Sequence, residues 1–415
     1  MDDLTFTPII NKFLNCRSKT LELINNLYEE DTVVQSERFV SPLKWHLGHT
    51  SWFFENFILT QYDKKFKIFN DGFSYIFNSY YNVFGSFNKQ EKRGLLNRPL
   101  LSEIIEYREF IDLKITKLLE KKSFNKEINF LINLGINHEQ QHQELILMDL
   151  KHIFYSNPLK PYYIKKIEKK FLANLKYKNH WNLDQGIEFK VGGDPDKFCF
   201  DNELPEFDVF ITPFNLSEYV TNNDWLRFID DGGYEKYEYW LSDGWELVNK
   251  YKIKRPLYWI DNNHYFDLSG VNKIDKNLPV SHISYYEANA FANYLNKRLP
   301  SEQEVEFVLK NTQENGIFLE DQMFKEVSYN NKSLSSSFFG NLWVWTSSNY
   351  NPYKGYESLK LKANEYNSKF MCNQFVLKGG SFATPRDHIR PSYRNFYYPS
   401  DRWQFSGLRL VEDLN

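Results

Sequence analysis

Two histidines four residues apart give the clearest chemical signal in this 415-residue sequence. They are His138 and His142, in the string His-Glu-Gln-Gln-His, and apolar residues at three- and four-residue steps around them predict a helix. On a helix, positions i and i+4 project from the same face, so the two imidazoles can bind one metal ion. Such pairs also arise by chance in soluble helices, so a metal site needs a further source of ligands.

A second segment, residues 42–52, offers that source. His46 and His49 lie three residues apart on another predicted helix, and facing helices of a bundle can bring metal ligands to a shared core. Either histidine could complete the site. For a lone histidine on a mostly apolar helix, a hydrogen-bonded core residue is the commoner role, and spacing alone leaves the choice open.

The same His-Glu-x-x-His spacing occurs in zinc proteases, where the central glutamate, here Glu139, is the general base. That mechanism needs a third ligand at a family spacing. The histidine of the extended protease motif is absent, and the distal acidic candidate, Glu168, lies in a Lys-rich charged run. A zinc protease is therefore the less favoured hypothesis.

Residues 1–155 carry helical periodicity. Helices are predicted over residues 11–29, 43–59, 101–119 and 128–154. The pair Ser41-Pro42 suits a helix start, since proline is tolerated in the first turn. Short connections between such helices favour an antiparallel bundle.

The pattern changes after residue 181. Short apolar pieces alternate with Gly-, Pro- and Asp-rich turn signals over residues 182–415, which predicts short strands and irregular loops. Two helices are expected in this part, over residues 284–298 and 301–309. Residues 156–181, with two prolines and a lysine-rich run, are predicted to be a linker.

Composition narrows the class of protein. The chain is 42% hydrophobic and 25% charged, and its 51 Lys and Arg against 54 Asp and Glu give a net charge of −3, with no basic excess for nucleic acid. No segment approaches the roughly 20 apolar residues of a membrane helix, and the acidic N-terminus does not match a secretory signal. Three isolated cysteines support neither disulfides nor a Cys-rich zinc site. We therefore expect a cytoplasmic protein without a membrane or nucleic-acid partner.

Four segments in this order resemble the sulfoxide synthases of ergothioneine biosynthesis, and the resemblance covers essentially the whole chain. They are residues 41–55, 77–81, 138–145 and 394–410. The resemblance implies an α+β fold, in which a DinB-like four-helix bundle precedes a formylglycine-generating-enzyme domain. That second domain is C-type-lectin-like, mixed, and poor in regular structure.

The resemblance also implies a metal and a reaction. Its ligands would be His49, His138 and His142 around Fe(II), with His46 structural, and three imidazoles leave up to three positions open in an octahedral shell. Imidazole suits iron as well as zinc, so the identity of the metal comes from the family. The implied activity uses O2 to form a C–S bond between a thiol, expected to be cysteine, and the imidazole of Nα-trimethylhistidine (hercynine).

Further site residues follow from the same resemblance. Gln141 would hydrogen-bond the substrate imidazole, because an amide can both donate and accept. Tyr80 and Tyr81 would stand at the active site, where one phenol supplies a proton and favours C–S bond formation over thiol dioxygenation; Tyr81 is slightly preferred.

Asn395, Phe396 and Tyr397 lie where the family binds the trimethylated amine, which aromatic faces and a side-chain carbonyl suit. Relatives that use γ-glutamylcysteine carry an acid at the position of Tyr397, so cysteine is the expected thiol. One departure is Phe39, where this subclass carries Asp, which opens the possibility of a selenium donor. Candidate carboxylate clamps are Arg93, Arg98, Arg386, Arg390 and Arg394.

Other functions stay open at this point. They include a selenoneine-type C–Se synthase and an ovothiol-type cysteine–histidine synthase. A formylglycine-generating oxidase needs two late cysteines, and only Cys372 lies there. A non-catalytic binding module is a further class, because both component folds serve unrelated roles.

Overall fold

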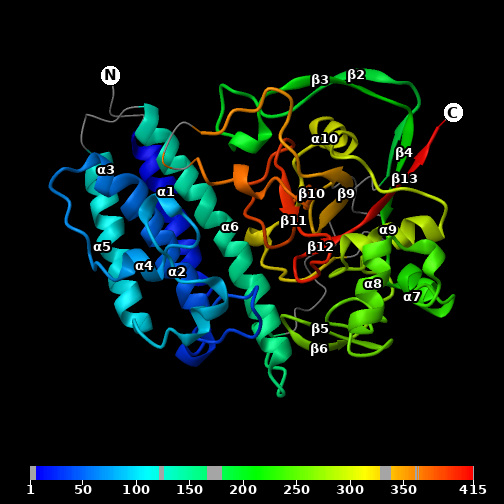
Figure 1. Cartoon of the computed structure of the whole chain (residues 1–415), viewed down its shortest axis with the longest axis horizontal. Coiled ribbons are helices and arrows are strands. Elements are labelled where there is room, and N and C mark those ends of the chain that lie inside the picture. Colours follow the sequence, from blue (N-terminus) through cyan, green and yellow to red (C-terminus); the bar gives the residue numbers. More distant parts are fainter. Residues whose placement is uncertain are drawn as a thin grey trace. The chain divides into compact units, whose positions relative to one another are not determined.

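The computed structural model describes residues 6–120, 126–165, 180–327, 338–359, 362 and 364–414, which belong to two compact units (Figure 1). The helical unit comprises Met1–Tyr163 and the segment Leu359–Glu365, and the mixed unit comprises Ile164–Ser358 and Tyr366–Asn415. Residues 166–179 of the predicted linker lie outside the described residues. The first residue of that linker, Ser156, is the last residue of the long helix that ends the helical bundle.

Four long helices build the helical unit: α1 (Phe6–Glu22), α2 (Leu43–Phe54), α5 (Leu101–Leu119) and α6 (Lys126–Ser156). Helices α1 and α2 each pack against both α5 and α6, which is the arrangement of a four-helix bundle (Figure 1). Every residue of α2 is buried, so this helix forms the centre of the unit. The connections carry one π-helical turn (Glu55–Leu59), α3 (Thr60–Tyr62), α4 (Phe73–Ile76) and three 3-10 turns (Glu29–Thr32, Asn82–Phe84 and Gln90–Leu95).

The predicted helices match the observed ones closely except the first, which begins at Phe6 instead of residue 11 and also ends early. Helix α2 begins directly after Pro42, whose extended backbone caps the helix, as the Ser-Pro pair predicts. The first helix was expected to reach residue 29 but ends at Glu22. The chain then turns through Asn25 and Asn26, residues whose side chains compete with helical hydrogen bonding.

A buried ion network joins three helices of the bundle. The carboxylate of Glu139 on α6 accepts hydrogen bonds from Arg17 on α1 and Arg108 on α5, both at 2.8 Å, and from the hydroxyl of Thr20 at 2.6 Å. Although burial opposes ionisation, the two guanidinium groups lower the pKa of Glu139 to about 2. Glu139 therefore serves as a fixed anion in the bundle core.

The mixed unit contains short strands in several sheets. A four-stranded sheet has the order β11 (Asn395–Tyr397), β10 (Phe375–Lys378), β9 (Trp343–Asn349) and β12 (Ser406–Gly407). A three-stranded sheet has the order β1 (Trp181–Leu183), β4 (Phe214–Tyr219) and β13 (Arg409–Asp413). Three pairs complete the described strands: β2 (Ile187–Val191) with β3 (Phe207–Ile211), β5 (His264–Asp267) with β6 (Gly270–Lys273), and β7 (Gly316–Ile317) with β8 (Phe339–Gly340).

The sequence predicted two of the four α-helices described in the mixed unit. Both predicted helices are present, as α9 (Tyr285–Tyr294) and α10 (Glu302–Lys310), each with a serine at its N-cap. Helix α9 ends before the predicted residue 298, and Asn296 in the following turn has a positive φ of 52°. The prediction missed α7 (Asn222–Asp230) and α8 (Ser242–Tyr251), two short helices rich in polar and aromatic residues.

No helix in the described ranges combines the length and the apolar character needed to cross a membrane.

The ion network predicts the effect of removing one charge. Glu139→Gln keeps the shape of the side chain but leaves two buried guanidinium groups without their shared anion, so we expect the free energy of unfolding to fall by about 3–5 kcal/mol. Urea unfolding followed by circular dichroism measures this change. The matched control is Glu106→Gln on the exposed face of α5, expected to change stability by less than about 0.5 kcal/mol. Equal stability of the two variants would contradict the role given to Glu139.

Candidate metal centre

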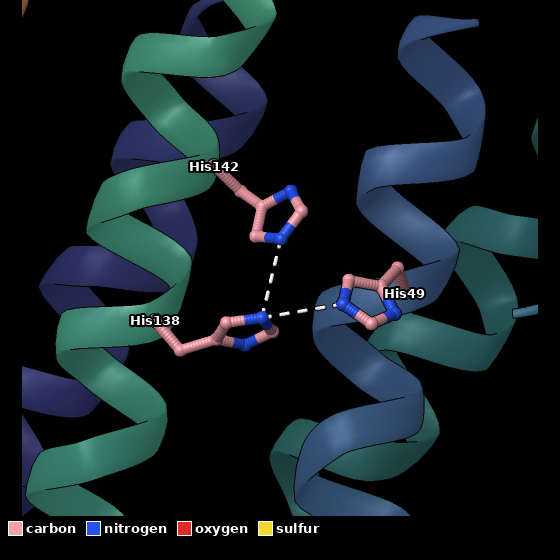
Figure 2. Close-up of side chains that lie close together, drawn as sticks. All are labelled: His49, His138 and His142. Atoms are coloured by element: carbon pink, nitrogen blue, oxygen red, sulfur yellow. Dashed lines mark hydrogen bonds between the residues drawn. The ribbon is translucent and has the colours of Figure 1, made fainter. Parts of the chain in front are cut away.

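Three buried imidazoles from two helices meet inside the helical unit. Figure 2 shows His138 and His142 projecting from α6 toward His49 on α2. The Nε2 atom of His138 lies 3.2 Å from Nε2 of His49 and 3.2 Å from Nε2 of His142. The three ligand atoms all lie within 4.8 Å of one another. The i and i+4 spacing thus places two nitrogens on one face, and the second helix supplies the third.

The distal nitrogens of two of these rings are held by hydrogen bonds. Nδ1 of His49 lies 2.6 Å from the backbone oxygen of Phe77, which can only accept, so this nitrogen carries the proton and Nε2 carries the lone pair. Nδ1 of His142 lies 2.8 Å from Nδ1 of His46, whose Nε2 lies 2.9 Å from Asp149. His46 therefore contacts a member of the cluster from outside it and does not join it.

Burial keeps the three rings in the form that can bind a metal. Removal from water lowers the pKa of His138 to about 3 and holds the pKa values of His49 and His142 well below the ordinary value for histidine. Neighbouring imidazoles lower the last two further. All three rings are consequently neutral near pH 7, and a neutral imidazole is the form that ligates metal ions.

Two of the three nitrogen–nitrogen distances match those around a single transition-metal ion. Bonds of roughly 2.1 Å at angles of 90–109° separate ligand nitrogens by roughly 3.0–3.4 Å, and the two Nε2 contacts at 3.2 Å fall in this range. Glu139, between the two helical histidines in sequence, does not belong to the cluster because its carboxylate is bound by Arg17 and Arg108.

The segment 77–81 (Phe-Asn-Ser-Tyr-Tyr) packs directly on the helix that carries His49. A Cβ at Gly48 would lie 2.2 Å from the ring of Phe77, so only glycine lets this segment approach the helix. The buried Asn78 then fixes Tyr81 through two backbone hydrogen bonds of 2.9 Å, one donated and one accepted. This contact places both tyrosines next to α2.

Stacked rings connect His49 with the tyrosine pair. Trp45 and Trp52 lie one turn before and one turn after His49 and stack on it at centroid distances of 4.6 and 5.7 Å. Trp52 also stacks on the fully buried Tyr81 at 5.7 Å, and the hydroxyl of Tyr80 donates to that of Tyr81 at 3.3 Å. Both predicted tyrosines thus stand within the aromatic surroundings of the histidine cluster.

The other predicted substrate residues lie in different places. Gln141 is half-buried on α6, beside His142. Asn395, Phe396 and Tyr397 form β11 in the mixed unit, and all three are half-buried. Because successive residues of a strand face opposite sides, Asn395 and Tyr397 share one face and Phe396 has the other.

The ring of Phe396 has different surroundings from the ring of Tyr397. Its ring stacks on Tyr350 at a centroid distance of 4.1 Å, and its backbone N–H donates to the side chain of Asn395 at 3.0 Å. The ring of Phe396 is thus packed within the mixed unit, whereas Tyr397 lies edge-on to Trp403 at 6.3 Å. The alternation along a strand could have separated these residues from sequence alone.

Three of the five candidate carboxylate clamps already bind carboxylates of the chain. Arg386, Arg390 and Arg394 pair with Asp321, Glu203 and Glu302, respectively. Arg98 is exposed and donates to the carbonyl of Asn97. Arg93 is buried, donates to Ser41 at 2.9 Å, and lies 3.4 Å over the ring of Trp45. Within the described part of the chain, no carboxylate lies within ion-pairing distance of Arg93, so it is the best-placed candidate.

Phe39, at the position where the resemblance expects Asp, stands near α6. Its ring lies edge-on to His152 at 5.2 Å, and its backbone oxygen accepts from Gln90 at 2.8 Å. The side chain is 38% exposed. Because it is a phenylalanine, it offers no acidic group at this position.

Sequence reasoning missed several residues that shape the site. Trp45 and Trp52 were not singled out, although their spacing of four and three residues from His49 places them on its helix face. The backbone oxygen of Phe77 has no sequence signal at all. Asp149 was recognisable only as an acid seven residues after His142.

Comparisons with known proteins agree with this picture. A family model described as sulfatase-modifying factor enzyme 1-like domain matches residues 183–337 and 335–414, more than half of the chain. The chain belongs to this family. The prediction of a formylglycine-generating-enzyme fold for the second part is thereby confirmed.

Three curated relatives extend the similarity beyond that domain. Hercynine oxygenase from Mycolicibacterium thermoresistibile is 24% identical, and the match covers 98% of this chain and 95% of the relative. Hercynine oxygenase from Mycobacterium tuberculosis is 28% identical over 69% of this chain and 72% of the relative. Ergothioneine biosynthesis protein 1 from Schizosaccharomyces pombe is 28% identical over 52% of this chain and 28% of the relative. These similarities confirm the predicted kinship with ergothioneine-pathway oxidoreductases.

The cluster predicts metal binding that depends on each ring. Protein loaded anaerobically with Fe(II) is expected to retain about one ion per chain, and His138→Ala is expected to lose it because two imidazoles remain. Metal analysis after gel filtration measures the ratio. The control is His152→Ala, which removes another buried histidine of α6 outside the cluster and should keep the metal. Full retention of iron by His138→Ala would contradict the site.

Proposed function

We propose that this chain is a non-haem iron oxygenase that joins a thiol, cysteine, to the imidazole of hercynine and forms a sulfoxide. The proposal rests above all on the histidine cluster, whose three Nε2 atoms face one another with neutral rings. Similarity to hercynine oxygenases over nearly the whole chain supports the substrate and the type of reaction.

The proposed reaction balances with O2 as the only oxidant. One thiol S–H and one imidazole C–H are lost, one oxygen atom enters the sulfoxide, and the other leaves as water. When bound by His49, His138 and His142, Fe(II) would supply a redox centre with open positions for O2 and for sulfur. The remaining requirements are orientation, exclusion of water and proton transfer, which protein side chains can meet.

The tyrosine pair is the proposed proton source. Tyr81 is fully buried, and its hydroxyl accepts a hydrogen bond from Tyr80, so a proton given up by Tyr81 can be replaced from its neighbour. Asn78 fixes the backbone of Tyr81 on both sides, which limits the directions that the phenol can take. We therefore assign proton donation to Tyr81, with Tyr80 in support.

Each unit by itself carries candidate groups for hercynine, one suited to a neutral ring and the other to a quaternary amine. Gln141, next to His142, can hydrogen-bond the imidazole. On β11, the shared face of Asn395 and Tyr397 offers an amide and an aromatic ring of the kind that attract a trimethylammonium group. Phe396, with its ring stacked on Tyr350, would then anchor the opposite face of this strand.

Cysteine is the favoured thiol because Tyr397 stands where relatives that use γ-glutamylcysteine carry an acid. Phe39 provides no carboxylate for the amino group of the thiol, so a selenium donor is the alternative. Arg93 is a buried cation with no carboxylate within ion-pairing distance in the described part of the chain, although the charge of Asp149 acts on it from farther away. Its guanidinium would bind the carboxylate of the thiol substrate.

Two alternative activities lack support in the site. A zinc protease would need Glu139 as a base, yet two guanidinium groups hold this carboxylate in the bundle core. A formylglycine-generating oxidase would need a reactive pair of thiols. Burial raises the pKa of Cys199 to about 12, Cys372 is exposed, and Cys16 is buried in the helical unit.

Anaerobic reconstitution provides the direct test. The Fe(II)-loaded protein is mixed with hercynine and cysteine, O2 is admitted, and the products are identified by mass spectrometry. The expected product is the hercynine–cysteine sulfoxide. Exclusive reaction with γ-glutamylcysteine or a selenium donor would correct the co-substrate, whereas failure of every donor with metal-loaded protein would contradict the proposed reaction.

A single phenol is expected to control the outcome. In Tyr81→Phe the proton donor is gone, so C–S bond formation should fall roughly 100-fold or more, and oxidation of cysteine to its sulfinic acid should take a larger share. The ratio of the two products, measured by mass spectrometry, reports the change. Tyr75→Phe, in the half-exposed part of α4, is the matched control and should leave the ratio unaltered.

A further inference from the structure

A chain of hydrogen bonds runs from His142 away from the metal centre. Nδ1 of His142 lies 2.8 Å from Nδ1 of His46, and Nε2 of His46 lies 2.9 Å from Oδ2 of Asp149. The same oxygen accepts the backbone N–H of Ser41 at 2.8 Å. All of these residues are buried, with exposed fractions of 8% or less. The chain therefore joins α6 to the start of α2 without contact with bulk water.

One arrangement of protons along this chain leaves His142 able to bind a metal ion. The backbone N–H of Ser41 donates to Oδ2 of Asp149. In this arrangement Nε2 of His46 donates to the same oxygen, and the lone pair of His46 lies on Nδ1. That lone pair accepts the Nδ1 proton of His142, which leaves Nε2 of His142 unprotonated and facing His138.

We propose that His46 and Asp149 are positioning residues that set the tautomer and the ring orientation of His142 for metal binding, an inference that rests on the proposed metal site. A ligand histidine whose second nitrogen donates to a fixed acceptor is held in one orientation and becomes a more basic ligand. Neither His46 nor Asp149 lies in the ligand cluster, so their effect on the metal passes through His142 alone.

The hydrogen-bond chain from His142 through His46 to Asp149, called the relay below, differs from the arrangement around His49. There the distal proton goes to the backbone oxygen of Phe77, an acceptor that cannot change its role. His142 instead donates to another histidine, which has two possible tautomers, and Asp149 removes that ambiguity. Without the carboxyl group, His46 could donate to His142, place the proton on Nε2 of His142, and block the metal.

The test uses the full-length protein with Co(II) and Zn(II) as probes. In Zn(II)-loaded protein labelled with 15N-histidine, long-range 1H–15N spectra should show His46 with its proton on Nε2 and His142 with its proton on Nδ1. For His46→Phe we expect the affinity for Co(II) to fall 10–100-fold, together with a change in the visible absorption of the bound ion. Asp149→Asn, which keeps the shape of the side chain, should show a smaller loss and a mixture of His46 tautomers.

The matched control is His152→Phe, which replaces another buried histidine of α6 that hydrogen-bonds Ser36. It should lose stability without a change in the Co(II) spectrum or affinity, and circular dichroism confirms folding of each variant. If His46→Phe and His152→Phe bind Co(II) equally and with the same spectrum, the relay is wrong while the metal site stands. A proton on Nδ1 of His46 in the wild-type protein also overturns it. Wild-type protein that binds no Co(II) refutes the metal site and the relay together.

Discussion

Three imidazole nitrogens can share one cation only if none of them carries a proton at the shared position. In this chain burial keeps the rings neutral, and the backbone oxygen of Phe77 accepts the distal proton of His49. In our proposal His46 accepts the distal proton of His142. Each acceptor must itself be held in place. The backbone of the segment 77–81 and the start of α2 are therefore as much a part of the centre as the histidines.

In the bundle, the charged network around Glu139 is separate from the neutral histidines. Glu139 of α6 forms a network with Arg17 and Arg108, and this network ties three helices together. The histidines, one residue or one turn away, lie among aromatic rings and remain neutral. A helix advances by about 100° per residue, so adjacent positions can face such different surroundings. This explains why the glutamate of this His-Glu-x-x-His string, Glu139, is not available as the base of a protease.

Much of this arrangement could be predicted from sequence because it depends on periodic spacing. The pair His138 and His142 and the bundle helices follow from three- and four-residue steps. The choice between His46 and His49 does not, since both lie on buried faces of α2 and only their partners across the bundle differ. Helix α7 has only nine residues, fewer than the roughly 11–18 over which a helical period can be recognised. A backbone acceptor such as that of Phe77 leaves no trace in residue types.

Phe77 contributes to the helical unit in two ways, through a carbonyl oxygen bonded to His49 and a ring that fills the space above Gly48. Four residues later the chain reaches Tyr81. The phenols and the imidazole are thus mechanically coupled across one short stretch of backbone. A shift of that stretch would move the phenol of Tyr81 and turn the ring of His49 at the same time, so proton donation and metal binding, as proposed, depend on the same piece of backbone.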